Sequence, residues 1–167
     1  KNNLDELGIK LSDKELKMVT SKVIELGDKK ERVTIEDLPY IINDVLDYPE
    51  KNKKVIIDSY VLTSAKTLKP STALSMIIEN KLYQETASGD GQFDAFMNAL
   101  KSIYRSIGLK LPKLIDYSVR IPPGSDSDAL CETTITWNSG KKKFKTRGLD
   151  SDQTVAAIKA TEKMLNI

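Results

Sequence analysis

The chain has 167 residues, of which 40% are hydrophobic and 30% charged, and its formal net charge is +2. This length and composition allow one domain of ordinary size with a buried core, whereas so small a net charge does not favour a nucleic-acid partner. The sequence contains no histidine, which excludes His-dependent catalytic triads and His-based zinc sites, and no apolar run approaches the ~20 residues of a membrane span.

Residues 1–50 predict a helical segment made of two short amphipathic helices. In the first helix, Ser12 and Glu15 have the spacing of a capping box, and we expect Gly27 to end it. Thr34 and Asp37 have similar spacing ahead of the second helix. The apolar residues on the two helix faces are Leu16, Val19, Val23 and Leu26, and Leu38, Ile41, Ile42 and Val45. Because two short helices cannot bury such faces alone, we expect them to pack on the rest of the chain.

A polar break after Asp47 separates this segment from residues 51–167, where β-branched and aromatic residues become frequent. Three such stretches predict strands. They are residues 55–65, 72–79 and 81–87. A helix then begins near Gly91, and its apolar residues fall on one face. These residues are Phe93, Phe96, Leu100, Ile103 and Ile107.

The same order of elements then recurs. Residues 114–121 alternate between apolar and polar, with Ile115, Tyr117, Val119 and Ile121 on one face, and a second strand is predicted over 129–137. A third short strand and a helix that begins near Ser151 complete the repeat. The sequence therefore predicts an α+β fold, in which two βββα units, about 55–108 and 112–167, follow the helical segment.

The single cysteine, Cys131, excludes an intrachain disulfide and fits a reducing compartment, which we expect to be the cytoplasm. Cys131 lies in a predicted strand, where a buried structural thiol is favoured over a nucleophile.

Both repeat helices are preceded by small and acidic residues. Asp150 stands three before Gln153, which is capping-box spacing. The other helix follows Gly89, Asp90 and Gly91. These glycines permit a tight turn, or they clear side chains from a helix N-terminus whose free N–H groups bind carboxylate or phosphate. The spacing matches neither a Walker loop nor a GxGxxG fingerprint.

Catalysis by carboxylates is poorly supported, because most of the aspartates lie where turns or helix caps are expected. The aspartates considered are Asp90, Asp94, Asp116, Asp126, Asp128, Asp150 and Asp152. The stretch "GSDSDAL" lacks the glutamate and central glycine of a calcium loop, which favours a solvated turn.

Four stretches in this order resemble one known family. "GDGQFDAF", "LIDYSVR" and "GLDSDQTVAAIKATEKML" are similar to the C-terminal regulatory domain of 2-isopropylmalate synthase and its relatives, citramalate synthase and homocitrate synthase. The leading "LGIKLSDKELKMVTSKVIELGDKKERVTIEDL" resembles the linker subdomain that joins the catalytic barrel to that domain. The resemblance covers nearly the whole chain. It implies a linker subdomain over 1–50 and an effector-binding, dimerising domain over 51–167.

The resemblance implies feedback regulation. In this family a metal-dependent (β/α)₈ barrel condenses acetyl-CoA with a 2-oxo acid, which is 2-oxoisovalerate in leucine biosynthesis. That barrel is absent from these residues, so we expect an excised regulatory fragment of an acyltransferase, and Lys1 in place of an initial Met agrees. We expect the fragment to be non-catalytic and to hold no cofactor or metal. We also expect it to form a homodimer and to regulate the catalytic barrel of the same chain.

Matched motif by motif, the resemblance implies that an end-product amino acid binds between the two units near the dimer interface. The residues expected at this effector are Gly91, Phe93, Asp94, Leu114, Tyr117, Ile121, Ala129, Ser151 and Gln153. Asp94 would receive the ammonium group, because a buried ammonium needs an acceptor. Periodicity alone favours ordinary core packing for Tyr117 and Ile121.

Leucine is the first candidate effector, because the second unit looks most like leucine-sensing 2-isopropylmalate synthases. Isoleucine, the effector of citramalate synthase, is the nearest alternative, and an apolar pocket separates two such isomers by only ~1–3 kcal/mol. A stand-alone small-molecule-binding or dimerisation module is the other alternative.

Overall fold

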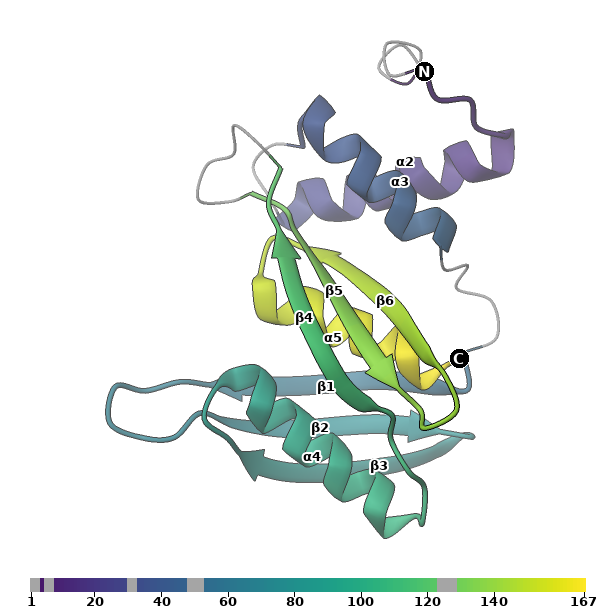
Figure 1. The fold of residues 1–167 in the computed structure, drawn as a ribbon. Coiled ribbons are helices and arrows are strands. Elements are labelled where there is room, and N and C mark those ends of the chain that lie inside the picture. The colour runs from purple at the N-terminus through teal and green to yellow at the C-terminus, as the bar shows by residue number, and fades with distance from the viewer. Residues whose placement is uncertain (1–3, 5–7, 30–32, 48–52, 123–128) are drawn as a thin grey trace.

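The structure is a computed structural model that describes residues 4, 8–29, 33–47, 53–122 and 129–167. Its elements are α2 (Asp13–Lys29), the short 3₁₀ helix η1 (Ile35–Asp37), α3 (Leu38–Asp47), β1 (Val55–Thr63), β2 (Ser71–Ile78), β3 (Lys81–Ser88), α4 (Gln92–Ser106), β4 (Lys113–Arg120), β5 (Cys131–Asn138), β6 (Lys143–Asp150) and α5 (Gln153–Leu165). The α+β class and the order of a helical segment followed by two βββα units are confirmed (Figure 1). The predicted solvated turn in "GSDSDAL" lies almost entirely outside the described residues.

Helix α2 begins at the predicted capping box. Glu15 Oε2 accepts a hydrogen bond from Ser12 N at 2.8 Å, and Ser12 Oγ accepts one from Glu15 N at 3.3 Å. The expected end at Gly27 is wrong, because the helix continues to Lys29. A glycine ends a helix by adopting a positive φ, and Gly27 does not adopt one.

The capping pair Thr34 and Asp37 is confirmed, although it starts a single 3₁₀ turn that leads directly into α3. Asp37 Oδ2 accepts a hydrogen bond from Thr34 N at 2.9 Å. Helices α2 and α3 then share a small buried core with two leucines of the second unit. One leucine lies just before β5 and the other lies in β6. This core contains Val19, Leu26, Ile41, Ile42 and Val45, together with Leu130 and Leu149. The helical pair therefore packs on the rest of the chain, as the sequence predicts.

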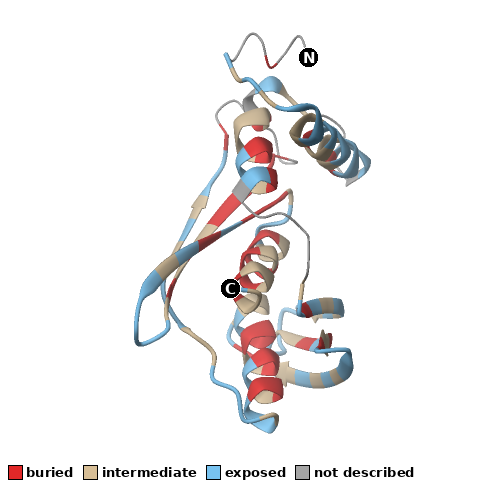
Figure 2. Cartoon of the chain, turned by 90° about the vertical axis from the view of Figure 1, so that its right-hand side faces the viewer, coloured by how far each residue is buried: buried red, intermediate tan, exposed pale blue. Residues whose placement is uncertain are grey.

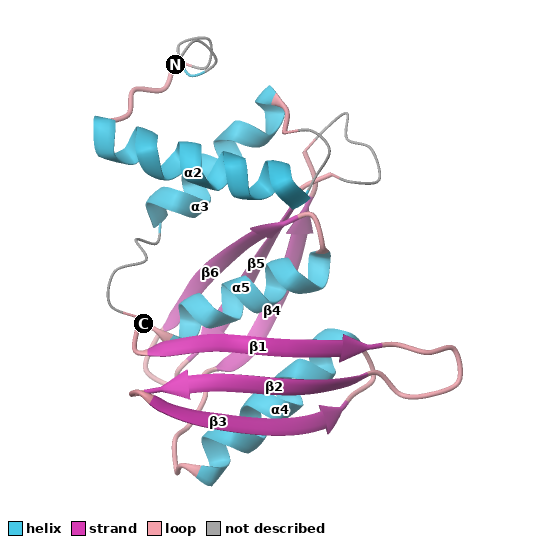
Figure 3. Cartoon of the chain, turned by 180° about the vertical axis from the view of Figure 1, so that it is seen from behind, coloured by secondary structure: helices cyan, strands magenta, loops and turns pink. Residues whose placement is uncertain are grey.

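The first βββα unit is an antiparallel sheet in the order β1-β2-β3, with α4 on one face (Figure 3). Strands β2 and β3 are joined by Glu79 and Asn80, both in the left-handed region at φ 48° and 65°, as a tight two-residue hairpin requires.

The second unit repeats this arrangement, with a sheet in the order β4-β5-β6 and α5 against it. The clean alternation expected over 114–121 is only partly correct. The pairing of β4 with β5 shifts between Leu114 and Asp116, and this irregularity leaves Ile115 44% exposed. An extra residue in one strand reverses which face the following side chains occupy. Only Tyr117 and Val119 are half-buried along β4.

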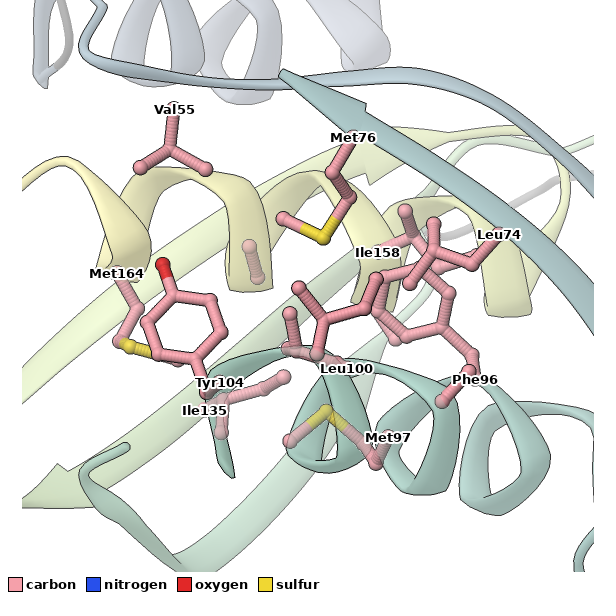
Figure 4. Close-up of a cluster of buried hydrophobic side chains, with 14 of the residues drawn as sticks. Val55, Leu74, Met76, Phe96, Met97, Leu100, Tyr104, Ile135, Ile158 and Met164 are labelled. Carbon is pink, nitrogen blue, oxygen red and sulfur yellow. The ribbon is translucent and has the colours of Figure 1, made fainter. Parts of the chain in front are cut away.

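The two units share one hydrophobic core. Figure 2 shows α4 and α5 between the two sheets, and Figure 4 shows side chains from both units meeting there. Phe96 and Leu100 of α4 are fully buried, as is Trp137 of β5. Trp137 also donates a hydrogen bond from Nε1 to Thr146 Oγ1 at 2.8 Å. Among the described helices, none is long and apolar enough to cross a membrane.

Candidate functional site

The two glycines that precede α4 have different surroundings. Gly91 is the N-cap residue, its backbone is extended at φ −143°, and a Cβ added to it would meet no atom within 4 Å. A Cβ added to Gly89 would collide with Ala95 N and lie 2.6 Å from Asp94 Oδ2. Gly89 is therefore required for close packing against the first turn of α4. The interpretation that the glycines clear space for a ligand fits Gly91 alone.

The start of α4 has no side-chain cap, because Gly91 has no side chain to supply one. Asp94, in the first turn, accepts a hydrogen bond from Asp90 N through Oδ2 at 2.9 Å. A carboxylate has about four lone-pair positions, so this bond leaves capacity for a further donor. The α4 start thus combines free backbone N–H groups with a nearby carboxylate, which are complementary to the two charged ends of an amino acid.

An open groove of about 770 Å³ lies beside this helix start. Phe93 and Asp94 line it from α4, and Leu114 lines it from β4. Tyr117 packs on Phe93 with ring centroids 5.8 Å apart. Three of the predicted residues therefore line the groove, namely Phe93, Asp94 and Leu114. Gly91 is the N-cap residue just before them, and Tyr117 reaches the site through its contact with Phe93.

The other predicted residues lie apart from this groove. Ile121 follows β4 and is 56% exposed, while Ala129 is buried just before β5. Ser151 and Gln153 lie at the start of α5, and neither lines the groove beside α4. A single copy of the chain therefore does not bring the nine residues together.

The start of α5 is organised differently from the sequence prediction. Asp152 is the N-cap residue, and its Oδ1 accepts hydrogen bonds from Thr154 N at 2.7 Å and Val155 N at 3.0 Å. The predicted capping box of Asp150 with Gln153 is wrong. The buried Asp150 side chain instead pairs with Lys159 Nζ at 2.7 Å. Because Asp152 occupies two N–H groups, α5 offers fewer free donors than α4.

Sequence reasoning missed two tyrosines near these helices. Tyr60 of β1 packs edge-on against Phe96 at 6.2 Å, and its burial, followed by the charges of Asp150, Asp152 and Glu162, raises its pKa. Tyr104 lines the groove beside α4, and burial raises its pKa to about 12. Tyr104 follows Leu100 by four residues, so helical spacing was the signal that could have found it.

Cys131 is 8% exposed, as expected for a structural thiol. Burial, with smaller contributions from Asp152 and Asp150, raises its pKa. A raised pKa lowers the fraction of thiolate, which is the nucleophilic form. Within the described part of the chain, no group of three or more Cys, Asp and Glu side chains is placed to hold a metal ion.

Comparison with known proteins gives one family match, to the LeuA allosteric (dimerisation) domain over residues 32–167. Curated relatives include the 2-isopropylmalate synthase of Carboxydothermus hydrogenoformans, which is 32% identical over 162 residues, covering 96% of this chain and 30% of the relative. The 2-isopropylmalate synthase of Aquifex aeolicus is 29% identical over 167 residues, covering 99% and 31%. A putative (R)-citramalate synthase of Archaeoglobus fulgidus is 29% identical over 164 residues, covering 98% and 33%. The chain spans about a third of the length of these relatives.

Proposed function

Because this chain belongs to the LeuA allosteric (dimerisation) domain family, we propose that it is the feedback-regulatory part of a 2-isopropylmalate synthase and binds leucine. In this proposal residues 1–50 are the linker subdomain and 51–167 are the effector-binding and dimerisation domain. The parent acyltransferase would act in the cytoplasm and carry its catalytic barrel on the same chain. The regulatory part would have no acyl-transfer activity of its own.

The observation that carries the proposal is the uncapped start of α4 beside Asp94 and a groove that has both apolar and charged lining residues. The leucine carboxylate would accept hydrogen bonds from the N–H groups after Gly91, where the helix dipole is positive. The ammonium would donate to Asp94. Phe93, Leu114 and Tyr117 would surround the aliphatic side chain, whose burial contributes about 1.5–3 kcal/mol.

The remaining predicted residues fit the proposal if a second copy completes the site. Ile121, Ala129, Ser151 and Gln153 belong to the second unit and lie apart from the groove in one copy. An effector that binds at a dimer interface is enclosed by residues of both copies. Such an effector favours one arrangement of the dimer, which is how its binding could affect a distant barrel.

We expect the chain to form a homodimer in solution. The edge strand β4 leaves two large apolar side chains exposed, Leu114 at 40% and Ile115 at 44%, and Ile121 just beyond it is 56% exposed. An edge strand with exposed apolar side chains is a favourable place for a second copy to pack. Analytical ultracentrifugation should give twice the mass of one chain, and Ile115→Glu should shift the equilibrium toward the monomer. A stable wild-type monomer at micromolar concentration would count against this assembly.

Isoleucine is the second candidate effector, because the putative (R)-citramalate synthase relative matches the chain as closely as one of the 2-isopropylmalate synthases. The two effectors share their charged ends and differ only in the position of one methyl branch. The same carboxylate and ammonium partners would therefore serve either amino acid, and only the apolar part of the groove would distinguish them.

Calorimetric titration of the wild-type dimer with leucine, isoleucine and valine tests the proposal. We expect leucine to bind most tightly, and Gly91→Val to weaken it at least tenfold by filling the space before α4. Tyr117→Ala should weaken binding by removing the support of Phe93. Tyr40→Ala, which removes a tyrosine from the distant α2–α3 core, is the matched control.

The titrations of the wild type and of its variants distinguish two kinds of failure. If none of the three amino acids binds a folded wild-type dimer, the sensing function is wrong. If leucine binds and Gly91→Val and Tyr117→Ala leave its affinity unchanged, the function stands and the placement of the site is wrong.

A further inference from the structure

The C-terminal end of helix α5 is hydrogen-bonded to β1. Asn166, the residue after the helix, accepts a hydrogen bond from Val55 N at 3.0 Å and donates one to Val55 O at 2.8 Å. Glu162 accepts one from Ile57 N at 2.9 Å and pairs with Lys53 at 2.7 Å. These side chains bond to the backbone of an edge strand, so α5 and the first sheet are held in one fixed arrangement.

Ion pairs join α5 to the α2–α3 pair. Lys163 Nζ lies 2.6 Å from Asp44 Oδ1, and these side chains are only 15% and 11% exposed. Lys22 of α2 approaches the other oxygen of Asp44 at 3.9 Å. Lys159 of α5 lies 3.9 Å from Glu25 of α2. Asp44 of α3 therefore pairs with one lysine from α5 and with one lysine from α2.

A cavity of about 560 Å³ lies between the helical pair and α5. Met18 and Val45 line it from the helical pair, and Val155 and Ile158 line it from α5. These apolar side chains are therefore not packed tightly across this boundary. Close apolar packing of the helical pair on the second unit is found elsewhere, at the fully buried Leu130 and at Leu149.

We infer that the ion pairs centred on Asp44 form a releasable latch, and that the α2–α3 pair swings about its contact with Leu130 and Leu149 when the latch opens. Figure 3 shows α5 between the helical pair and β1. Opening breaks the ion pairs Lys163–Asp44 and Lys159–Glu25 across an existing cavity, whose charged groups can be rehydrated, whereas the apolar contact at the pivot stays buried.

The latch rests on the proposed function only for its biological output. Helix α5 begins at Gln153, one of the predicted effector residues that lie apart from the groove in one copy, and its last turn carries Lys163, which pairs with Asp44. Because α5 is fixed to β1, a small movement of α5 together with the first sheet on effector binding would lengthen or shorten the pair to Asp44. The Lys163–Asp44 ion pair would thereby couple effector binding to a change in the angle of the α2–α3 pair.

The latch can be tested without a ligand by measuring distances between spin labels. Labels are placed on cysteines at Lys17 of α2 and Gln84 of β3, both exposed, in a Cys131→Ala background, and the labelled chain is diluted with unlabelled chain. We expect Asp44→Asn and Lys163→Met each to widen the distance distribution about twofold. Lys69→Met is the matched control, because it breaks the exposed pair with Asp90.

Equal widths in wild type, Asp44→Asn and Lys163→Met would overturn the latch. If one of these two variants does not fold, the other decides. A salt titration of the labelled wild type needs no mutation, and it should widen the distribution toward about 1 M salt, where the Debye length falls to about 3 Å.

The same labelled protein tests the output with leucine as the probe. We expect saturating leucine to shift the distance distribution of the wild type and to have less effect on Lys163→Met. If calorimetry shows that leucine binds and the distribution does not move, the latch does not transmit the effector. If leucine does not bind, the proposed function fails, and the ligand-free measurements still decide whether the latch exists.

Discussion

The Gly148→Ala substitution should lower the free energy of unfolding by about 3 kcal/mol or more, the upper end of the range for overpacking a core. Gly148 lies in β6, and a Cβ there would overlap Ala156 O and lie 2.7 Å from Ala160 N. Both atoms belong to the backbone of α5, so no side-chain rotation relieves the collision. The whole helix must move away from the sheet, and that movement disturbs the hydrogen bond from Thr146 Oγ1 to Ala160 O, 2.7 Å long.

Urea unfolding followed by circular dichroism measures this effect, at one fixed protein concentration because a dimer's stability depends on it. Gly27→Ala is the matched control. Gly27 is helical, and a Cβ there would meet no atom within 4 Å, so the same substitution should stabilise the chain by about 0.5–1 kcal/mol. If Gly148→Ala unfolds within about 0.5 kcal/mol of wild type, α5 packs on β6 less closely than the structure shows.

The elements that follow local rules could be predicted from the sequence. The capping pair Ser12 and Glu15 fixes the start of α2 by hydrogen bonds three residues apart, and the face of α4 from Phe96 to Ile103 follows helical spacing alone. Both signals lie within one element and need no knowledge of its neighbours. The order of two βββα units followed from adding such local signals along the chain.

Apart from the expected helix end at Gly27, the predictions that failed depended on contacts between elements. The three-residue spacing of Asp150 and Gln153 predicts a capping box. In the fold, Asp150 is the last residue of β6, at the buried end of that strand, and it pairs with Lys159, nine residues later. The irregular pairing of β4 near Ile115 likewise arises from its register with β5, which sequence alternation does not reveal.

The candidate site was predicted in part. Phe93 and Asp94 belong to one helix turn, so the motif that contains them is enough to place them together. Their approach to Leu114 and Tyr117 depends on how the first unit packs against the second, and only the resemblance to a known family indicated it. The separate roles of the two glycines were hidden, because spacing does not show which of them touches α4.

The two glycines before α4 make the sharpest test of the site, because packing and ligand approach predict different effects on the free energy of unfolding. We expect Gly89→Ala to lower the free energy of unfolding by about 2–3 kcal/mol, since the added Cβ would lie 2.6 Å from Asp94 Oδ2 and 2.8 Å from Asp94 C. Its displacement of the first turn should also weaken leucine binding at least tenfold.

We expect Gly91→Ala to change stability by less than about 1 kcal/mol, because Gly91 has extended backbone and open space in front of it. Leucine must approach the same space, so Gly91→Ala should still weaken binding about tenfold. Urea unfolding and calorimetry on both variants separate the two roles. A Gly91→Ala variant that binds leucine as tightly as wild type would show that the effector does not enter at this helix start, whatever Gly89→Ala does.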